Sequence, residues 1–207
     1  MPTANSQIQQ IQKQRTFVMI KPDGVLRGLT GAILTRFENR GLKVVAMKML
    51  QAKREILEKH YPASRKEWVE RLGTKGRDAF ASVGQDLTQD PDYSDYKMGS
   101  EVLNSLIEYM LSGPVLCMVI EGVQSISVIR KMVGSTLPTM ADIGTIRGDY
   151  SVDFPIVGLA QGRALHNLVH ASENQEEADY EINLWFKPEE ILNYSMGLEH
   201  ITVNKYY

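Results

Sequence analysis

The stretch Thr16-Phe17-Val18-Met19-Ile20-Lys21-Pro22-Asp23-Gly24 gives the chain its clearest strand signal. Its first five residues are apolar or β-branched, which is typical of a strand buried on both faces. Because proline fixes φ and glycine permits positive φ, the last four residues predict a turn. Lys21 would then stand at the carboxyl end of a buried strand, where α/β-type sheets often bind anionic ligands. A solvated turn lysine is the alternative interpretation.

A short apolar pair precedes a single histidine in a second stretch, Asn167-Leu168-Val169-His170-Ala171-Ser172-Glu173. Ser172 with Gln175 fits a capping box, which predicts that a helix begins directly after the stretch. Apolar residues then recur at helical spacing, and Glu181 lies close to their stripe. A helix returning over the strand would bring Glu181 to the imidazole, as in an activated nucleophile or general base. The alternative is a strand-end histidine bonded to backbone.

Composition indicates a globular protein of the cytoplasm. Hydrophobic residues make up 43% of the 207 residues, which suits one domain, or one domain with a large insertion. The longest apolar run, residues 115–120, is far shorter than the roughly 20 residues that span a membrane. A single cysteine excludes an internal disulfide and suits a reducing compartment. The net charge of −2 gives no reason to expect nucleic acid as the main partner.

Three separated motifs resemble the nucleoside diphosphate kinase family, in the family's order. They are residues 15–28 (RTFVMIKPDGVLRG), residues 144–149 (GTIRGD) and the stretch around His170. The resemblance covers roughly residues 15–61 and 105–194. It implies an α+β, ferredoxin-like βαββαβ sandwich with a four-stranded antiparallel sheet and helices on one face.

Within this frame we expect a mobile N-terminal arm at residues 1–14. The remainder, residues 15–207, would form a single domain. Insertions at about 64–100 and 152–166 interrupt the resemblance. The first insertion predicts an exposed, mixed-charge excursion with short helices near 67–72 and 78–83, and the second a loop or short hairpin.

The resemblance also implies an activity. The family moves the γ-phosphoryl group of a nucleoside triphosphate, typically ATP, to a nucleoside diphosphate by a ping-pong mechanism through a phosphohistidine. His170 would be the nucleophile, oriented by Glu181 and Ser172. Mg²⁺ would bridge the phosphates, held by nucleotide and water rather than directly by protein. The side chains implied to position phosphates and ribose are Lys21, Tyr61, Arg130, Thr136, Arg147 and Asn167.

From the residues alone, several of these assignments have alternatives. Tyr61 could simply close the apolar stripe of a helix, and Arg130 could be a solvated helix charge. His166 lies four residues before His170 and is a rival nucleophile on spacing. Residues 135–150 lack periodicity, which favours a functional loop containing Thr136 and Arg147.

Two further expectations concern ligands and partners. The family places an aromatic residue under the nucleobase, where this chain offers Trp68 or Val102 according to the alignment chosen. The family is oligomeric, so a homo-oligomer is expected, with a hexamer favoured. The alternative function is a nucleotide-binding interaction module in which the insertions prevent turnover.

Overall fold

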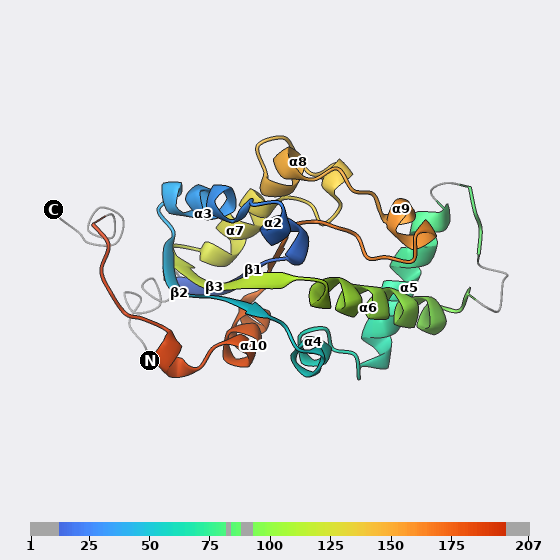
Figure 1. Ribbon diagram of the computed structural model, residues 1–207, viewed down its shortest axis with the longest axis horizontal. Coiled ribbons are helices and arrows are strands. Elements are labelled where there is room, and N and C mark those ends of the chain that lie inside the picture. Colours follow the sequence, from blue (N-terminus) through green and yellow to red (C-terminus); the bar gives the residue numbers. More distant parts are fainter. Residues whose placement is uncertain (1–12, 82–83, 88–92, 198–207) are drawn as a thin grey trace, which may run out of the picture.

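The computed structural model describes residues 13–81, 84–87 and 93–197. A four-stranded antiparallel sheet in the order β2-β3-β1-β4 forms its centre (Figure 1). The strands are β1 (Gln14–Ile20), β2 (Lys43–Gln51), β3 (Pro114–Gly122) and β4 (Val169–Ala171). This is the predicted α+β, ferredoxin-like arrangement.

Strand β1 occupies the middle of the sheet, as its apolar sequence predicted. It pairs with β3 on one side and with the short edge strand β4 on the other. Met19 lies opposite Cys117 in β3 and opposite His170 in β4. Because side chains alternate along a strand, Phe17, Met19 and the following Lys21 share the face on which His170 lies.

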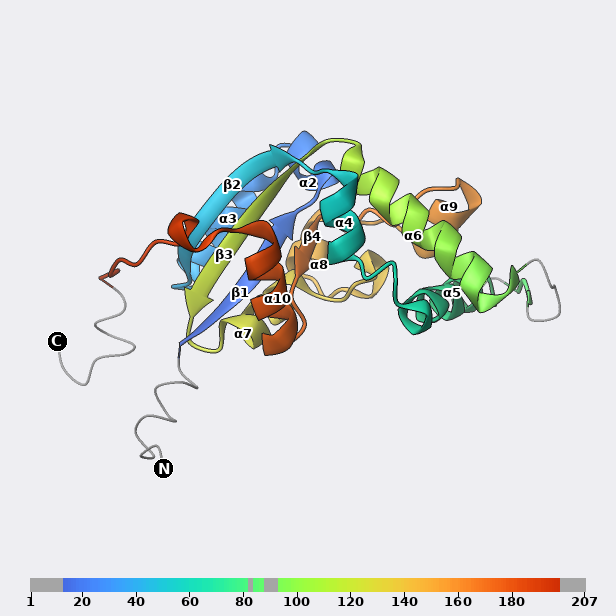
Figure 2. The ribbon, with the colours of Figure 1, turned by 90° about the horizontal axis from the view of Figure 1, so that it is seen from below.

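Helices cover both faces of the sheet, so the expectation of helices on one face is wrong (Figures 1 and 2). One core contains Phe17 and Met19 and is closed by α4 (Arg54–His60), α6 (Asp95–Leu111) and α10 (Gln175–Trp185). The other contains Val18 and Ile20 under α3 (Thr30–Asn39) and α7 (Ser125–Val133). A buried strand with apolar residues on both of its faces needs two such layers.

Shorter elements connect these layers. They are α2 (Pro22–Leu26), η2 (Pro138–Met140), α8 (Ile146–Tyr150) and η3 (Pro188–Glu190). The turn predicted after β1 is the start of α2, because Pro22 is favourable in the first turn of a helix.

The first insertion differs from its prediction. In its described part, the continuous helix α5 (Lys66–Ala81) takes the place of the two short helices, and α6 begins at Asp95. α5 packs tightly on α6, since a Cβ at Gly73 or Gly99 would lie within 2 Å of a carbonyl oxygen of the other helix. Glycine at these positions permits a helix contact that longer side chains would block. Segment 152–166 likewise holds a helix, α9 (Pro155–Ala160), rather than a hairpin. α9 contacts α5, so the two insertions meet (Figure 1).

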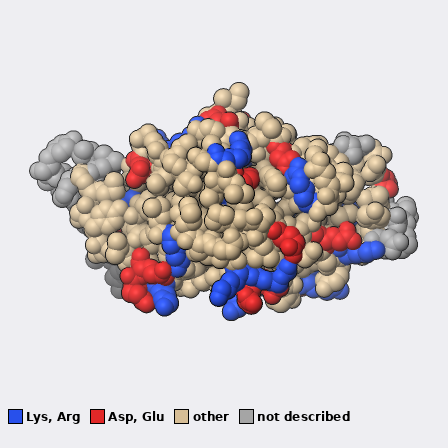
Figure 3. All heavy atoms as spheres, viewed as in Figure 1, with Lys and Arg blue, Asp and Glu red and all other residues tan. Residues whose placement is uncertain are grey.

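The remaining observations concern the N-terminal arm, the surface charge and the possibility of a membrane span. Most of the predicted arm at residues 1–14 lies outside the described residues, but Gln14 already pairs with Gly122 and belongs to the sheet. Lys and Arg side chains are mixed with Asp and Glu over the face shown in Figure 3. Within the described ranges, none of the helices is both long enough and apolar enough to traverse a bilayer.

Candidate active site

His170 and Glu181 meet as the sequence predicted. β4 carries His170, and α10 carries Glu181 over the same face of the sheet. The distance from His170 Nε2 to Glu181 Oε1 is 2.7 Å, and Ser172 Oγ donates to Glu181 Oε2 at 2.6 Å. Glu181 is only 2% exposed. The carboxylate is therefore held on both oxygens inside the protein.

The predicted capping box at Ser172 is wrong. α10 begins at Gln175, and the side chain of Asn174 accepts a hydrogen bond from Glu177 N at 2.9 Å. Ser172 is instead tied to β1, because Phe17 N donates to its hydroxyl oxygen at 3.3 Å. Its hydroxyl hydrogen is used on Glu181, so it serves the site rather than the helix end.

The hydrogen bonds of His170 determine which ring nitrogen is free. A carboxylate accepts hydrogen bonds, so Nε2 carries the proton toward Glu181 and Nδ1 keeps a lone pair. Burial, followed by the nearby charge of Lys21, lowers the pKa of His170. The ring is therefore neutral at pH 7, with a nucleophilic nitrogen on the side away from the carboxylate.

Lys21 is a buried cation at the end of β1. Its Nζ donates to Asn167 Oδ1 at 2.7 Å, and no carboxylate of the described residues forms an ion pair with it. Burial and the charge of Arg147 lower the pKa of Lys21 to about 7, against a smaller opposing effect of Asp23. An anionic ligand would supply the compensation that the fold leaves out.

Arg147 links the segments around His170 by hydrogen bonds. Its guanidinium donates to the backbone carbonyls of Asn167, Gly134 and Val169, the first two at 3.1 and 2.9 Å. Burial and the charge of Arg130 lower its pKa to about 10, so it stays charged at pH 7. Three of its five N–H groups are used on backbone, and the remainder can still face a ligand.

Sequence reasoning missed a second layer built on Asp23. Leu168 has φ of 66°, a left-handed conformation that is rare for a branched residue. Asp23 Oδ2 accepts from Leu168 N at 3.2 Å, and Tyr109 Oη donates to the other oxygen of Asp23. Lys21 N donates to Leu168 O at 2.8 Å. The available signal for this role was the position of Asp23 in a predicted turn, because Asp side chains in turns often accept hydrogen bonds from backbone N–H groups.

The other predicted residues lie around this centre. Asn167 Nδ2 donates to the carbonyl of Thr136 at 2.9 Å, which joins that loop to β4. The hydroxyl of Tyr61 is buried without a hydrogen-bond partner among the described residues. Arg130 lies on the exposed side of α7, yet its charge acts on both His170 and Arg147.

The rival residues are placed less favourably. The ring of His166 stacks on Tyr109, with centroids 4.6 Å apart, and no carboxylate of α10 bonds to it. Trp68 lies 6.4 Å from Tyr61, centroid to centroid, whereas Val102 packs near Gly76 of α5. Trp68 is thus the candidate base platform that lies beside a predicted site residue.

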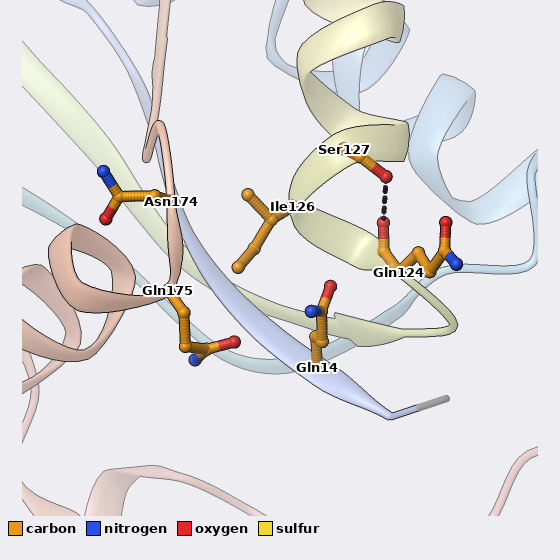
Figure 4. A pocket seen from close by; sticks show the side chains of 6 residues that line it. All are labelled: Gln14, Gln124, Ile126, Ser127, Asn174 and Gln175. Carbon is orange, nitrogen blue, oxygen red and sulfur yellow. Dashed lines mark hydrogen bonds between the residues drawn. The ribbon is translucent and has the colours of Figure 1, made fainter. Parts of the chain in front are cut away.

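A separate cavity of about 310 Å³ lies near Gln14, at the other end of β1 from Lys21 (Figure 4). Side-chain amides dominate its lining, and none of its residues is charged. The lining residues are Gln14, Gln124, Ile126, Ser127, Asn174 and Gln175. It lacks the cations that an anionic ligand needs, whereas Lys21 and Arg147 lie at the other end of the strand.

A model of the family described as nucleoside diphosphate kinase matches residues 14–72 and 86–191. The chain belongs to the nucleoside diphosphate kinase family. The kinase therefore transfers the γ-phosphoryl group of a nucleoside triphosphate, typically ATP, to a nucleoside diphosphate by a ping-pong mechanism. The unmatched residues 73–85 fall inside the first predicted insertion, and the boundaries of both insertions stay a prediction.

Relatives and solved structures agree with this assignment. A nucleoside diphosphate kinase of Pyrobaculum aerophilum is 44% identical, over 86% of the kinase and 98% of the relative. One of Methanosphaera stadtmanae is 43% identical over 91% and 96%. The crystal structure of the Pyrobaculum aerophilum enzyme matches with a TM-score of 0.82 at 41% identity, covering 87% of the kinase and all of that chain. A Borrelia burgdorferi transition-state mimic with vanadate and ADP gives 0.73 at 38% identity, covering 93% and 98%.

Proposed function

We propose that His170 is the residue that carries the phosphoryl group. Its Nδ1 attacks the γ-phosphorus of the triphosphate, the bond from phosphorus to the bridging oxygen breaks, and the diphosphate leaves. Glu181 accepts the hydrogen bond from Nε2 and stabilises the positive charge that the ring gains. The observation that carries this proposal is the 2.7 Å contact from Nε2 to a buried carboxylate, because it leaves Nδ1 as the free nitrogen.

In the same proposal, the surrounding side chains position the phosphates and the ribose. Phosphoryl transfer depends on charge compensation and in-line placement more than on covalent chemistry by the protein. Lys21 is buried and forms no ion pair with a carboxylate of the described residues, so phosphate oxygens are its natural counter-charge. The side chains proposed to hold phosphates and ribose are Lys21, Tyr61, Arg130, Thr136, Arg147 and Asn167.

We propose Mg²⁺ as the metal, bound through the nucleotide. The carboxylates of Glu181, beside His170, and of Asp23, beside Leu168, suit this, because both are already occupied by hydrogen bonds from the protein. Mg²⁺ keeps several waters and often binds phosphates in place of a protein cage. When bound, it neutralises charge on the β- and γ-phosphates, while the protein orients the nucleophile and the remaining oxygens.

We further propose a cytoplasmic homo-oligomer, with a hexamer favoured. Two exposed apolar surfaces support assembly: Met47 and Met49 on the edge strand β2, and Met140 with Ile143 before α8. The backbone carbonyls of Val44 and Val45 in β2 already accept from Tyr194 Oη and Leu192 N, so the support comes from the exposed side chains, and Ile143 is 95% exposed. Light scattering on the full chain would test this, and a monomer at micromolar concentration would contradict it.

The single, buried Cys117 supports the proposed cytoplasmic location, because a reducing compartment keeps a lone thiol unpaired.

Labelling with γ-labelled ATP tests the role of His170. The wild-type protein should yield a phosphoenzyme that is stable in base and labile in acid, and added GDP should remove the label as GTP. His170→Ala should take no label, while His166→Ala, the matched control, should still be labelled. Near-normal turnover by His170→Ala would show that the nucleophile has been misassigned.

A further inference from the structure

His166 lies at the end of the segment predicted as the second insertion, and its ring contacts Tyr109 of α6. The two rings stack, with centroids 4.6 Å apart and an interplanar angle of 24°. Within the described residues, the ring nitrogens of His166 form no hydrogen bond, and the bonds of this residue are made by its backbone. Stacking, rather than hydrogen bonding, therefore connects this side chain to the site.

The backbone of His166 is fixed at the point where the segment closes. Asp153 Oδ2 accepts from His166 N at 2.8 Å, and Ser151 Oγ donates to the carbonyl of His166 at 2.9 Å. Arg163 donates to both oxygens of Asp153, at 2.6 and 2.9 Å. Hydrogen bonds thus join the two ends of the segment, and this gives the His166 ring a defined place.

Tyr109 connects this ring to the residues around the proposed phosphate site. It is buried, and its hydroxyl donates to Asp23, whose other oxygen accepts from Leu168 N at 3.2 Å. Leu168 O accepts from Lys21 N at 2.8 Å, and Lys21 Nζ lies 5.7 Å from the centroid of the Tyr109 ring. A shift of Tyr109 would therefore reach both the backbone and the ammonium group of Lys21.

The first insertion contributes to the same arrangement. α6, which carries Tyr109, packs closely on α5, and α5 also contacts α9 of the second insertion. Figures 1 and 2 both show α5, α6 and α9 together at one end of the molecule. Tyr109 is thus held in two ways, through its own helix and through the ring of His166.

We propose that the second insertion supports phosphoryl transfer through His166, a positioning residue whose ring keeps Tyr109 in its hydrogen bond with Asp23. The inference rests on the function proposed above for His170. His166 does not touch the reacting atoms and acts only through Tyr109. Leu168 has a left-handed backbone that its branched side chain disfavours, so the segment that leads into His170 depends on the Asp23 contact.

Two variants separate ring stacking from other roles of His166. His166→Phe keeps a flat ring against Tyr109 but has no nitrogen, whereas His166→Leu keeps a similar volume without a ring. The measurement is the single-turnover rate of His170 phosphorylation at saturating ATP. We expect His166→Phe to stay within about twofold of wild type and His166→Leu to be about fivefold slower. Val152→Ala, at an exposed position of the same segment, is the control and should keep the wild-type rate.

A double-mutant cycle with Tyr109→Phe tests the route through the hydroxyl. Tyr109→Phe removes the hydrogen bond to Asp23, so the position of the ring no longer matters to the Leu168 backbone. In this background, His166→Leu should slow phosphorylation by less than about twofold more. An equal further loss in both backgrounds would overturn the inference, because His166 would then act independently of the Tyr109 hydroxyl.

The rates of the single variants also decide the inference. Equal rates for wild type, His166→Phe and His166→Leu would overturn it and leave His166 a packing residue. Low rates for both variants would overturn it as well, because the reaction would then need a ring nitrogen.

If His166→Leu does not fold, Asp153→Asn replaces it. This variant weakens the bonds that fix the His166 backbone, and it should slow phosphorylation beside Tyr109 but not beside Tyr109→Phe. Equal slowing in both backgrounds would overturn the inference. Labelling of His170→Ala would instead overturn the proposed function, whatever the rates of the His166 variants.

Discussion

Buried charge is compensated differently at the two ends of β1. At one end, Glu121 of β3 is 4% exposed and lies 2.8 Å from both Lys43 Nζ and Arg15 Nε, with Lys13 at 3.1 Å. At the other end, Lys21 is equally buried, and among the described residues its side-chain hydrogen-bond partner is the amide of Asn167. One end carries a charge that the chain compensates itself, and the other carries a charge for which we propose a ligand as the partner.

The pKa values of Glu121 and Lys21 reflect this difference in compensation. Burial raises the pKa of Glu121, but hydrogen bonds from Lys43, Arg15 and Lys13 outweigh it and lower the value to about 2. Burial lowers the pKa of Lys21 to about 7, with Arg147 adding to the effect. The compensated charge should therefore support stability, and the uncompensated one should support function at some cost in stability.

Removing the charge of Lys21 should have the largest effect. Lys21→Met keeps most of the side-chain volume but removes the cation that we propose binds the phosphates. We expect kcat/KM to fall by about 100-fold or more, in the range seen for loss of one preorganised electrostatic contact. The free energy of unfolding should stay level or rise, because a buried, unpaired charge has gone. Steady-state kinetics and urea unfolding measure the two effects, and a large loss of stability would contradict the comparison.

Neutralising Glu121 should give the reverse pattern. Glu121→Gln leaves three cations without their shared carboxylate, so we expect the free energy of unfolding to fall by about 2–3 kcal/mol. The kcat/KM of the folded protein should remain within about twofold of wild type, since Glu121 lies at the far end of β1 from Lys21. Urea unfolding and steady-state assays on the same preparation test both halves. A variant of normal stability and low activity would break the comparison.

A change of pH should act on the two ends in different windows. Lys21 is charged below about pH 7, so kcat/KM should fall as pH rises above 7, by up to tenfold per unit. Its folded pKa is lowered from 10.5, so unfolding takes up a proton between pH 7 and 10.5 and the Lys21 contribution to stability rises there. Lys21→Met should lack that rise.

The stabilising contribution of Glu121 belongs to the acid range. Its folded pKa lies below its ordinary value of 4.5, so the contribution is fully present above 4.5. It is lost as pH falls toward 2. Urea unfolding of wild type and Glu121→Gln across this range should converge at the acid end, and parallel curves would count against the assignment.

Loss of the Tyr109 hydroxyl should give the smallest effect. Tyr109→Phe removes one donor to Asp23 but keeps the ring, whose centroid lies 5.7 Å from Lys21 Nζ. We expect the free energy of unfolding to fall by about 1 kcal/mol, with a several-fold loss of kcat/KM as the Leu168 backbone loses support. Tyr150→Phe is a matched control at the half-buried end of α8, where the hydroxyl accepts only a long hydrogen bond of 3.4 Å from Arg36. Equal effects of the two variants would remove the special role of Asp23.

Local sequence was enough to predict the strands and the central pair of the site. Residues 17–20 are apolar without interruption, and a strand of that kind must be covered on both faces, so β1 had to be central. Helical spacing put Glu181 close to the stripe that faces the sheet, and the structure brings it to His170. The prediction failed at Ser172, whose hydroxyl donates to Glu181 and does not cap the helix that follows.

Only the tertiary structure determined how distant segments combine. Residue spacing shows which side chains share a face, but it does not say which other element lies against that face. For this reason Asp23 with Tyr109, and His60 with Glu181, emerged only when α6 and α4 were placed on the sheet. The same holds for the contact of α5 with α9, because helix packing depends on shapes that are far apart in the chain.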